Sequence, residues 1–139
     1  MSELKEYAVN LDQVIIAARI GDFEVTNLEV YAWYGGEKVT KVPGGASFEI
    51  HAEYNIENFN PGLLLAALWT TTFTVWDVTH NKIPEGSVGY DSFGAHSGGG
   101  LLTAHDAVNC IMPNEPTSYR VKLFANQAAY AGAPPTTEW

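Results

Sequence analysis

The segment that most constrains the fold is residues 47–57, where apolar and polar side chains alternate without a break. The apolar set is Phe48, Ile50, Ala52, Tyr54 and Ile56, and the polar set is Glu49, His51, Glu53, Asn55 and Glu57. Successive side chains of a strand point to opposite faces, so this period of two is typical of a strand with one face in a core and one in water. The segment predicts a β-sheet protein and says little about function.

Similar signals recur along most of the chain, separated by turn residues. Further predicted strands cover residues 23–34, 38–42, 67–79, 82–88, 101–112 and 118–126. Residues 89–100 are interpreted as a flexible, glycine-rich loop. No strand–helix alternation favours an α/β fold. We therefore predict a single antiparallel β-sandwich of about seven to nine strands with Greek-key connections.

The start of the chain allows two assignments. A capping-box spacing at Asn10 and a terminal Gly21 allow a short helix over residues 11–20. The β-branched residues 14–16 favour a strand or an extended arm instead, and we favour this assignment because every later segment is β. The predicted organisation is an arm (residues 1–22), a sandwich (residues 23–128) and an extended tail (residues 129–139).

Composition and charge narrow the class of partner. Seven Lys and Arg residues against sixteen Asp and Glu residues give a net charge of −9, and the basic residues do not cluster. Nucleic acid and anionic membranes attract clustered cations, so both are poor partners. No stretch reaches the roughly 18–20 apolar residues of a membrane span. The sequence shows no signal peptide, and a start at Met1 fits an intracellular product or one released by lysis.

The single cysteine, Cys110, can form no disulfide within the chain. It lies in a strand-like run beside Val108 and Met112, and free cysteines are often buried. A reactive thiol needs an electropositive, partly open setting, which no neighbour in the sequence supplies. We therefore predict that Cys110 is a small buried hydrophobe.

Few residues suggest catalysis or a cofactor. The metal-ligand candidates are His96, His105, Asp106 and Asp91. Their spacing is loose, and the strand neighbours His105 and Asp106 point to opposite faces, so they cannot easily share one ion. Ser92 lacks the pattern of a nucleophile elbow, and Gly98–Gly100 lacks the residues of a phosphate loop. We predict no metal site, no cofactor and no catalytic residue, with a small metal-dependent enzyme as the least favoured alternative.

Aromatic residues suggest a binding surface before the turn at Gly35. Tyr31 and Trp33 share one strand face, opposite Ala32. If Ala32 lies in the core, the two rings are exposed and suit stacking on a sugar or contact with a protein. The opposite parity makes them ordinary core residues, and the pattern favours neither alternative. The other aromatic candidates for binding are Tyr34, Tyr90 and Phe93.

Two further segments are candidates for contacts in an assembly. Leu63, Leu64 and Leu65 follow a Pro-Gly turn, and three leucines on a loop need cover, either over the core or against a neighbouring subunit. The proline-containing tail, which closes with Trp139, is expected to be extended. Together with the N-terminal arm, these segments predict a homo-oligomer or a larger assembly, with strand addition as a plausible means.

Five segments follow one another in the order of a known module. They are Thr26–Trp33, Val42–Glu57, Thr72–Thr79, Ile111-Met112-Pro113 and Tyr119–Asn126. The series of a turn glycine, an alternating strand, an asparagine, a Val-x-Asp strand and a Met-Pro segment resembles the immunoglobulin-like modules of the CARDB kind. These modules occur in archaeal, bacterial and phage surface or structural proteins. The resemblance covers roughly residues 23–128 and implies binding, spacing or assembly without catalytic residues.

These observations predict a non-enzymatic structural protein that assembles with copies of itself or with a larger particle. A virion component, such as a capsid decoration or tail protein, is the expected setting. The alternative is a carbohydrate- or surface-binding module that uses Tyr31, Trp33, Tyr34 and the loop from Tyr90 to His96. Residues 1–22 and the glycine-rich loop depart from the module's pattern, and a specialised role is expected there.

Overall fold

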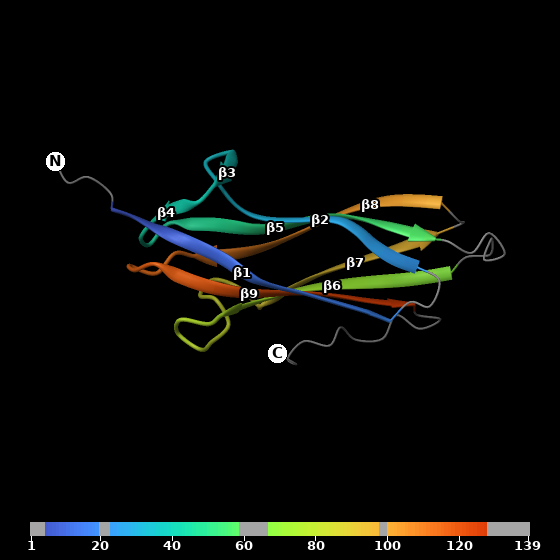
Figure 1. Cartoon of the computed structure of the whole chain (residues 1–139). Helices are drawn as coiled ribbons and strands as arrows, with labels where there is room; N and C mark the ends of the chain where they lie inside the picture. The colour runs from blue at the N-terminus through green and yellow to red at the C-terminus, as the bar shows by residue number, and fades with distance from the viewer. Residues whose placement is uncertain (1–4, 20–22, 59–66, 98–99, 128–139) are drawn as a thin grey trace.

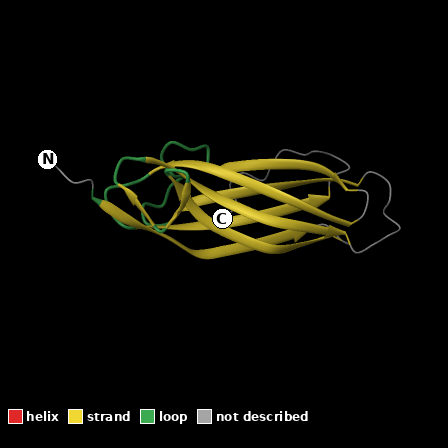
Figure 2. Ribbon diagram, turned by 90° about the horizontal axis from the view of Figure 1, so that it is seen from above, coloured by secondary structure: helices red, strands yellow, loops and turns green. Residues whose placement is uncertain are grey.

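The computed structural model describes residues 5–19, 23–58, 67–97 and 100–127. Every regular element within these residues is a β-strand, as Figure 2 shows. The strands are β1 (Glu6–Arg19), β2 (Phe23–Tyr34), β3 (Glu37–Val39), β4 (Lys41–Pro43), β5 (Ser47–Asn58), β6 (Ala67–Asp77), β7 (Tyr90–Ser97), β8 (Gly100–Ile111) and β9 (Thr117–Gln127).

The strands form two layers, which Figure 1 shows from the side. One sheet has five strands in the order β4-β1-β9-β6-β7, and the other has four in the order β3-β2-β5-β8. All pairs are antiparallel except β1 and β9, which run parallel. The all-β class and the two-sheet arrangement are thus confirmed, but one sheet is mixed rather than wholly antiparallel.

The connectivity differs from that of a constant-type immunoglobulin domain. In that domain the last two strands are neighbours in one sheet. Here β8 and β9 lie in opposite sheets. The strand order therefore adds no support to the immunoglobulin-like resemblance, which rests on the sequence motifs.

The beginning of the chain is a strand and contains no helix between residues 6 and 19. β1 pairs with β4 over Glu6–Ala8 and then with β9 from Val9 to Arg19. The register shifts between Asn10 and Gln13, the two residues whose spacing resembled a capping box. A bulge thus occupies the place where the less favoured helix would have begun, because β9 offers this β-branched segment a ladder of backbone hydrogen bonds.

The core lies between the sheets. The alternation along β5 correctly predicted which of its side chains face this core. Its inner residues Phe48, Ile50, Ala52 and Tyr54 are at most 3% exposed. The facing sheet contributes Phe73 and Val75 from β6, which are fully buried. It also contributes three residues of β9 that are each only 1% exposed, Tyr119, Val121 and Leu123. Trp76, of the opposite parity to Phe73 and Val75, is only half-buried.

Two local predictions between β6 and β8 are wrong. Residues 82–88 form turns with one isolated bridge, Asp77 to Lys82, instead of an edge strand. The glycine-rich segment instead forms β7, which pairs with β6 from Tyr90 to Ser97. Gly86 and Gly89 have φ of +83° and +88°, which suits turns and prevents a regular strand before Tyr90. Glycine weakens the interior of a strand, so the composition of residues 90–97 argued against the strand that they form.

Candidate functional site

The structure places Tyr31 and Trp33 on the outer face of the four-stranded sheet. Ala32 between them is 2% exposed and points into the core. This settles the parity that the sequence left open: both rings face away from the core, although each is half-buried. Tyr34 follows at the end of β2, is half-buried, and packs against the core.

Two histidines join these rings on the outer face and complete an aromatic–histidine cluster of Tyr31, Trp33, His51 and His105. The His51 ring stacks on Trp33 at an interplanar angle of 21° and a centroid distance of 5.4 Å. Its centroid is 5.2 Å from that of Tyr31 and 4.7 Å from that of His105. β2, β5 and β8 therefore each contribute at least one ring to a single patch.

The cluster corrects the interpretation of the outer face of β5 as solvated. His51 is only 7% exposed because aromatic side chains from the neighbouring strands cover it. His51 Nδ1 lies 2.8 Å from His105 Nε2, and His51 Nε2 lies 2.9 Å from Glu49 Oε1. If His51 Nε2–H donates to the carboxylate, Nδ1 accepts the hydrogen bond of His105. The result is a carboxylate–histidine–histidine chain at the surface of the sheet.

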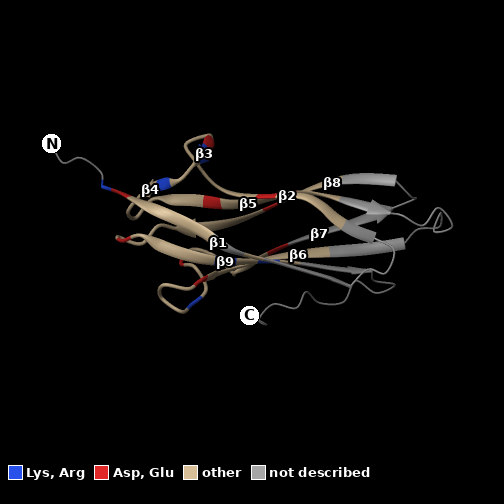
Figure 3. Cartoon of the chain, viewed as in Figure 1, with Lys and Arg blue, Asp and Glu red and all other residues tan. Residues whose placement is uncertain are grey.

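Carboxylates and one lysine surround the rings. Lys38 Nζ lies 2.8 Å from Glu29 Oε2 and 4.4 Å from the centroid of the Tyr31 ring. Burial raises the pKa of Tyr31 to about 12, helped by a hydrogen bond to Glu53 and by the charges of Glu53 and Glu29. The hydrogen bond to Glu29 raises the pKa of Lys38. Figure 3 shows acidic segments on β5 and basic residues near β3 and β4.

Two hollows flank the pair of aromatic rings. The first, of about 280 Å³, is lined by Trp33, Tyr34, Gly35, Gly36, Ser47, Phe48, Glu49 and Asn109. The second, of about 460 Å³, is lined by Glu6, Tyr31, Lys38, Val39, Thr40 and Lys41. The first hollow combines an aromatic ring with the carboxylate of Glu49, a combination suited to a polar or cationic group, whereas the second combines Tyr31 with two lysines and one glutamate.

The sequence predicted the two aromatic members of this cluster and missed the histidines. His51 and His105 are 54 positions apart, and they meet because β5 pairs with β8 in a register that sets Glu53 opposite His105. The alternation alone placed His51 on the outer face. Only the register shows that the two rings are diagonal neighbours on that face.

Two of the former metal candidates, His105 and Asp106, do not come together. His105 is exposed on the outer face, whereas Asp106 is 1% exposed inside the sandwich, as the alternation predicted. The side chain of His96 lies outside the described part of the chain. Among the described residues, no group of three or more His, Cys, Asp or Glu side chains could hold a metal ion.

The remaining predicted contact residues have different outcomes. Tyr90 begins β7 and is half-buried, and Phe93 lies within β7 with its side chain outside the described part. Leu63, Leu64, Leu65 and Trp139 also lie outside the described residues. Cys110 is a buried small hydrophobe as predicted, at 1% exposure, and burial raises the pKa of its thiol to about 12.

A buried polar network crosses the sandwich below the aromatic–histidine cluster. Tyr54 donates to Asp106 Oδ2 at 2.6 Å, and its hydroxyl oxygen is hydrogen-bonded to Thr71 of the opposite sheet. Within the described chain, Asp106 Oδ1 is buried without a hydrogen-bond partner. Burial is the largest cause of a raised pKa at Asp106, the hydrogen bond from Tyr54 lowers this pKa, the charge of Asp91 raises it, and the net result is a pKa of about 7.

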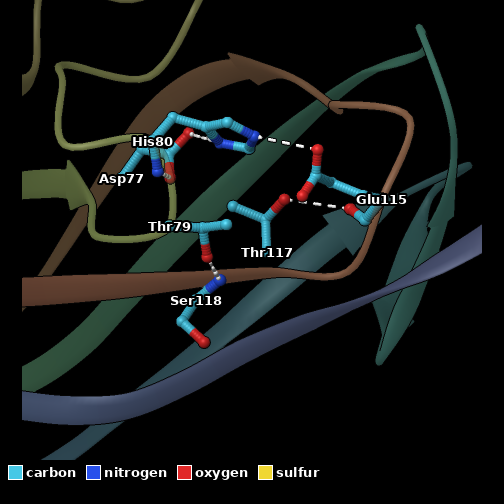
Figure 4. Close-up of polar contacts among 6 residues, drawn as sticks. All are labelled: Asp77, Thr79, His80, Glu115, Thr117 and Ser118. Carbon is cyan, nitrogen blue, oxygen red and sulfur yellow. Dashed lines mark hydrogen bonds and ion pairs between the residues drawn. The ribbon is translucent and has the colours of Figure 1, made fainter.

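A second polar cluster, the His80 clasp, ties two loops together at one end of the sandwich (Figure 4). His80 Nδ1 lies 2.7 Å from Asp77 Oδ2, and Nε2 lies 3.3 Å from Glu115 Oε2. The backbone N–H of His80 also donates to Asp77 Oδ1 at 2.9 Å. These carboxylates, Asp77 first, raise the pKa of His80. The clasp joins the turn after β6 to the loop before β9.

The far edge of β1 is a third distinct feature. β4 covers only Glu6–Ala8, and among the described residues no strand pairs with the opposite side of β1 from Asn10 to Arg19. Val14, within this stretch, is 43% exposed. Residues 13–18 contain no charged residue and no proline. A long apolar edge of this kind is a template for pairing with another strand.

Comparisons with protein-family models, curated proteins and solved structures found no match to this chain. In the part of the chain that the structure describes, no helix has the length and apolar character needed to cross a membrane.

Proposed function

We propose that this protein is a non-enzymatic structural subunit that assembles with copies of itself by strand addition at the open edge of β1. The observation that carries the proposal is the stretch from Asn10 to Arg19, which pairs with β9 on one side only within the described chain. Natural edge strands are usually protected by charges, prolines, bulges or a short length. The bulge before Gln13 and the charges of Asp12 and Arg19 lie at the two ends of this stretch, and residues 13–18 between them have no charge and no proline.

A symmetric dimer is the simplest product of such an edge. Two copies related by a two-fold axis would place β1 antiparallel to β1 of the partner, because a two-fold axis makes each edge meet its own copy. The two five-stranded sheets would then form one continuous sheet. The immunoglobulin-like modules that this sequence resembles occur in phage structural proteins. We therefore propose a virion particle as the setting. The immunoglobulin-like relationship is part of the same proposal.

The test is the mass of the full chain in solution, measured by gel filtration with light scattering. We expect the wild type to be a dimer or larger and Val14→Lys to shift it to monomer, because a charge on an edge opposes pairing. Val88→Lys is the matched control, since Val88 is 70% exposed on the loop between β6 and β7 and should leave the mass unchanged. A wild type that is monomeric at every concentration, or equal masses for the two folded variants, would refute the proposal.

A further inference from the structure

We infer that the outer face of the four-stranded sheet binds an arginine side chain presented by a protein partner, in the hollow formed by Trp33, Glu49 and Asn109. The inference goes beyond strand addition and is independent of it, because β1 belongs to the other sheet. The first observation that supports it is the ammonium group of Lys38, a cation of this chain that lies on the same face.

Lys38 shows how the face holds a cation. Its ammonium lies over the Tyr31 ring at 4.4 Å from the centroid and contacts Glu29 at 2.8 Å. An aromatic face and a carboxylate are the two kinds of group that recognise cations in proteins. The side chains of Lys38 and Glu29 are 50% and 53% exposed, so the contact forms at the surface, where a partner's side chain could compete for it.

Trp33 offers a similar arrangement beside it, open to a partner. One side of the indole stacks on His51, and the ring lines the first hollow together with Glu49 and Asn109. Glu49 is 38% exposed and pairs with His51 through Oε1. A carboxylate has about four acceptor sites, so Glu49 can accept further hydrogen bonds. Gly35 and Gly36 border the hollow without side chains to fill it.

The chemistry of the hollow favours a guanidinium. This planar group can stack on an indole while its N–H groups donate to a carboxylate and an amide oxygen. The surrounding face adds Glu29, which is paired with Lys38, and Glu53, on a chain of net charge −9. A neutral sugar could also stack on Trp33, but it would gain little from this excess of carboxylates.

The test is a calorimetric titration of the full chain and its variants with a capped tetra-arginine peptide, and the NMR signal of the Trp33 indole N–H locates the site in the wild type. We expect a saturable shift, and Trp33→Ala should weaken binding by about threefold or more, as loss of a surface cation–π contact predicts. Trp33→Ala leaves the net charge unchanged, so this loss separates the site from general attraction to an acidic protein. Glu49→Gln should weaken binding more than Glu85→Gln, which removes the same charge from an exposed loop.

Lys38→Ala should have the opposite effect and strengthen binding of the peptide. Lys38 lines the neighbouring hollow and not the one beside Trp33, so its removal leaves the proposed site intact. It also uncovers Tyr31 and frees Glu29 for a second arginine of the peptide, so tetra-arginine should bind about twofold to fivefold more tightly. Lys82→Ala makes the same charge change on the distant loop after β6 and should have a smaller effect. A gain confined to Lys38→Ala would show that the chain's own lysine competes with the ligand.

Equal affinities for the wild type, Trp33→Ala and Glu49→Gln would overturn the inference. Saturable binding of a neutral oligosaccharide such as maltotetraose at Trp33, without binding of the peptide, would overturn it in favour of a glycan site. If Trp33→Ala fails to fold, Glu49→Gln and Lys38→Ala still decide, since both change exposed side chains. Val14→Lys should bind the peptide as the wild type does, which distinguishes failure of this inference from failure of the assembly proposal.

Discussion

The two polar clusters, the buried network around Asp106 and the His80 clasp, use carboxylates in opposite ways. Asp106 is 1% exposed, and burial raises its pKa because the charged form is poorly solvated. The pKa of His80 is also raised, but by two carboxylates that stabilise its charged form. The same direction of pKa shift thus reports an unfavourable charge in the interior and a favourable charge at the loop end.

The sign of the pH dependence follows from the proton affinities of the folded and unfolded states. Folded Asp106 binds its proton more tightly than the unfolded chain does, since its pKa rises from 3.8 to about 7. Stability is therefore greatest below the unfolded pKa and falls as the pH rises through this interval. The contribution of His80 is complete below its unfolded value of 6.5 and is lost as the pH rises through its higher folded value. Both clusters make the protein less stable as the pH rises, Asp106 between pH 3.8 and about 7 and His80 above pH 6.5.

The largest expected effect is that of Asp106→Asn. The neutral amide keeps an acceptor for Tyr54 and cannot ionise, so the free energy of unfolding at about pH 8 should rise by on the order of a few kcal/mol. At about pH 4 the variant and the wild type should be nearly equal. Urea unfolding at both pH values measures the difference, and the same pH dependence in both proteins would show that Asp106 is not the group responsible.

Tyr54→Phe should have the next largest effect, in the opposite direction. It removes the hydroxyl that donates to Asp106 and is bonded to Thr71, and unsatisfied buried partners cost about 1–3 kcal/mol. The loss should be larger at alkaline pH, where an ionised Asp106 would lack its donor. Tyr34→Phe, at a half-buried tyrosine at the end of β2, serves as the control and should change the unfolding free energy little.

His80→Gln should have a smaller effect confined to acidic conditions. The clasp is partly exposed, so solvent screening limits an ion pair of this kind to about 1 kcal/mol or less. The melting temperature should fall at about pH 5.5 and remain unchanged at about pH 8.5. An equal loss at both pH values would indicate that the ring acts through packing and not through its charge.

The smallest expected effect concerns Cys110, which reports on opening of the interior. The thiol is 1% exposed, and burial raises its pKa to about 12, so a thiol reagent should modify the folded protein only slowly. At one alkaline pH, Asp106→Asn should slow the reaction further, because a more stable sandwich opens less often. A rate that is equal in the two proteins would mean that ionisation of Asp106 does not govern opening.

Local patterns were sufficient where one strand face simply enters the core. The alternation of β5 identified Phe48, Ile50, Ala52 and Tyr54 as inner residues, and the same reasoning separated Asp106 from His105. It was insufficient for His51, which lies on the predicted outer face and is nevertheless buried. Alternation gives the face on which a side chain lies, whereas its burial depends on which neighbours the register places beside it.

The sequence by itself determined the all-β class, the inner residues of β5, the burial of Cys110 and the shared face of Tyr31 and Trp33. Only the tertiary structure decided that β1 joins β9 in parallel, that a glycine-rich segment is an edge strand, and that His51 meets His105 across 54 residues. The first set follows from side-chain chemistry within one segment. The second depends on pairing between distant segments, where register and backbone hydrogen bonds choose among arrangements that each segment alone would allow.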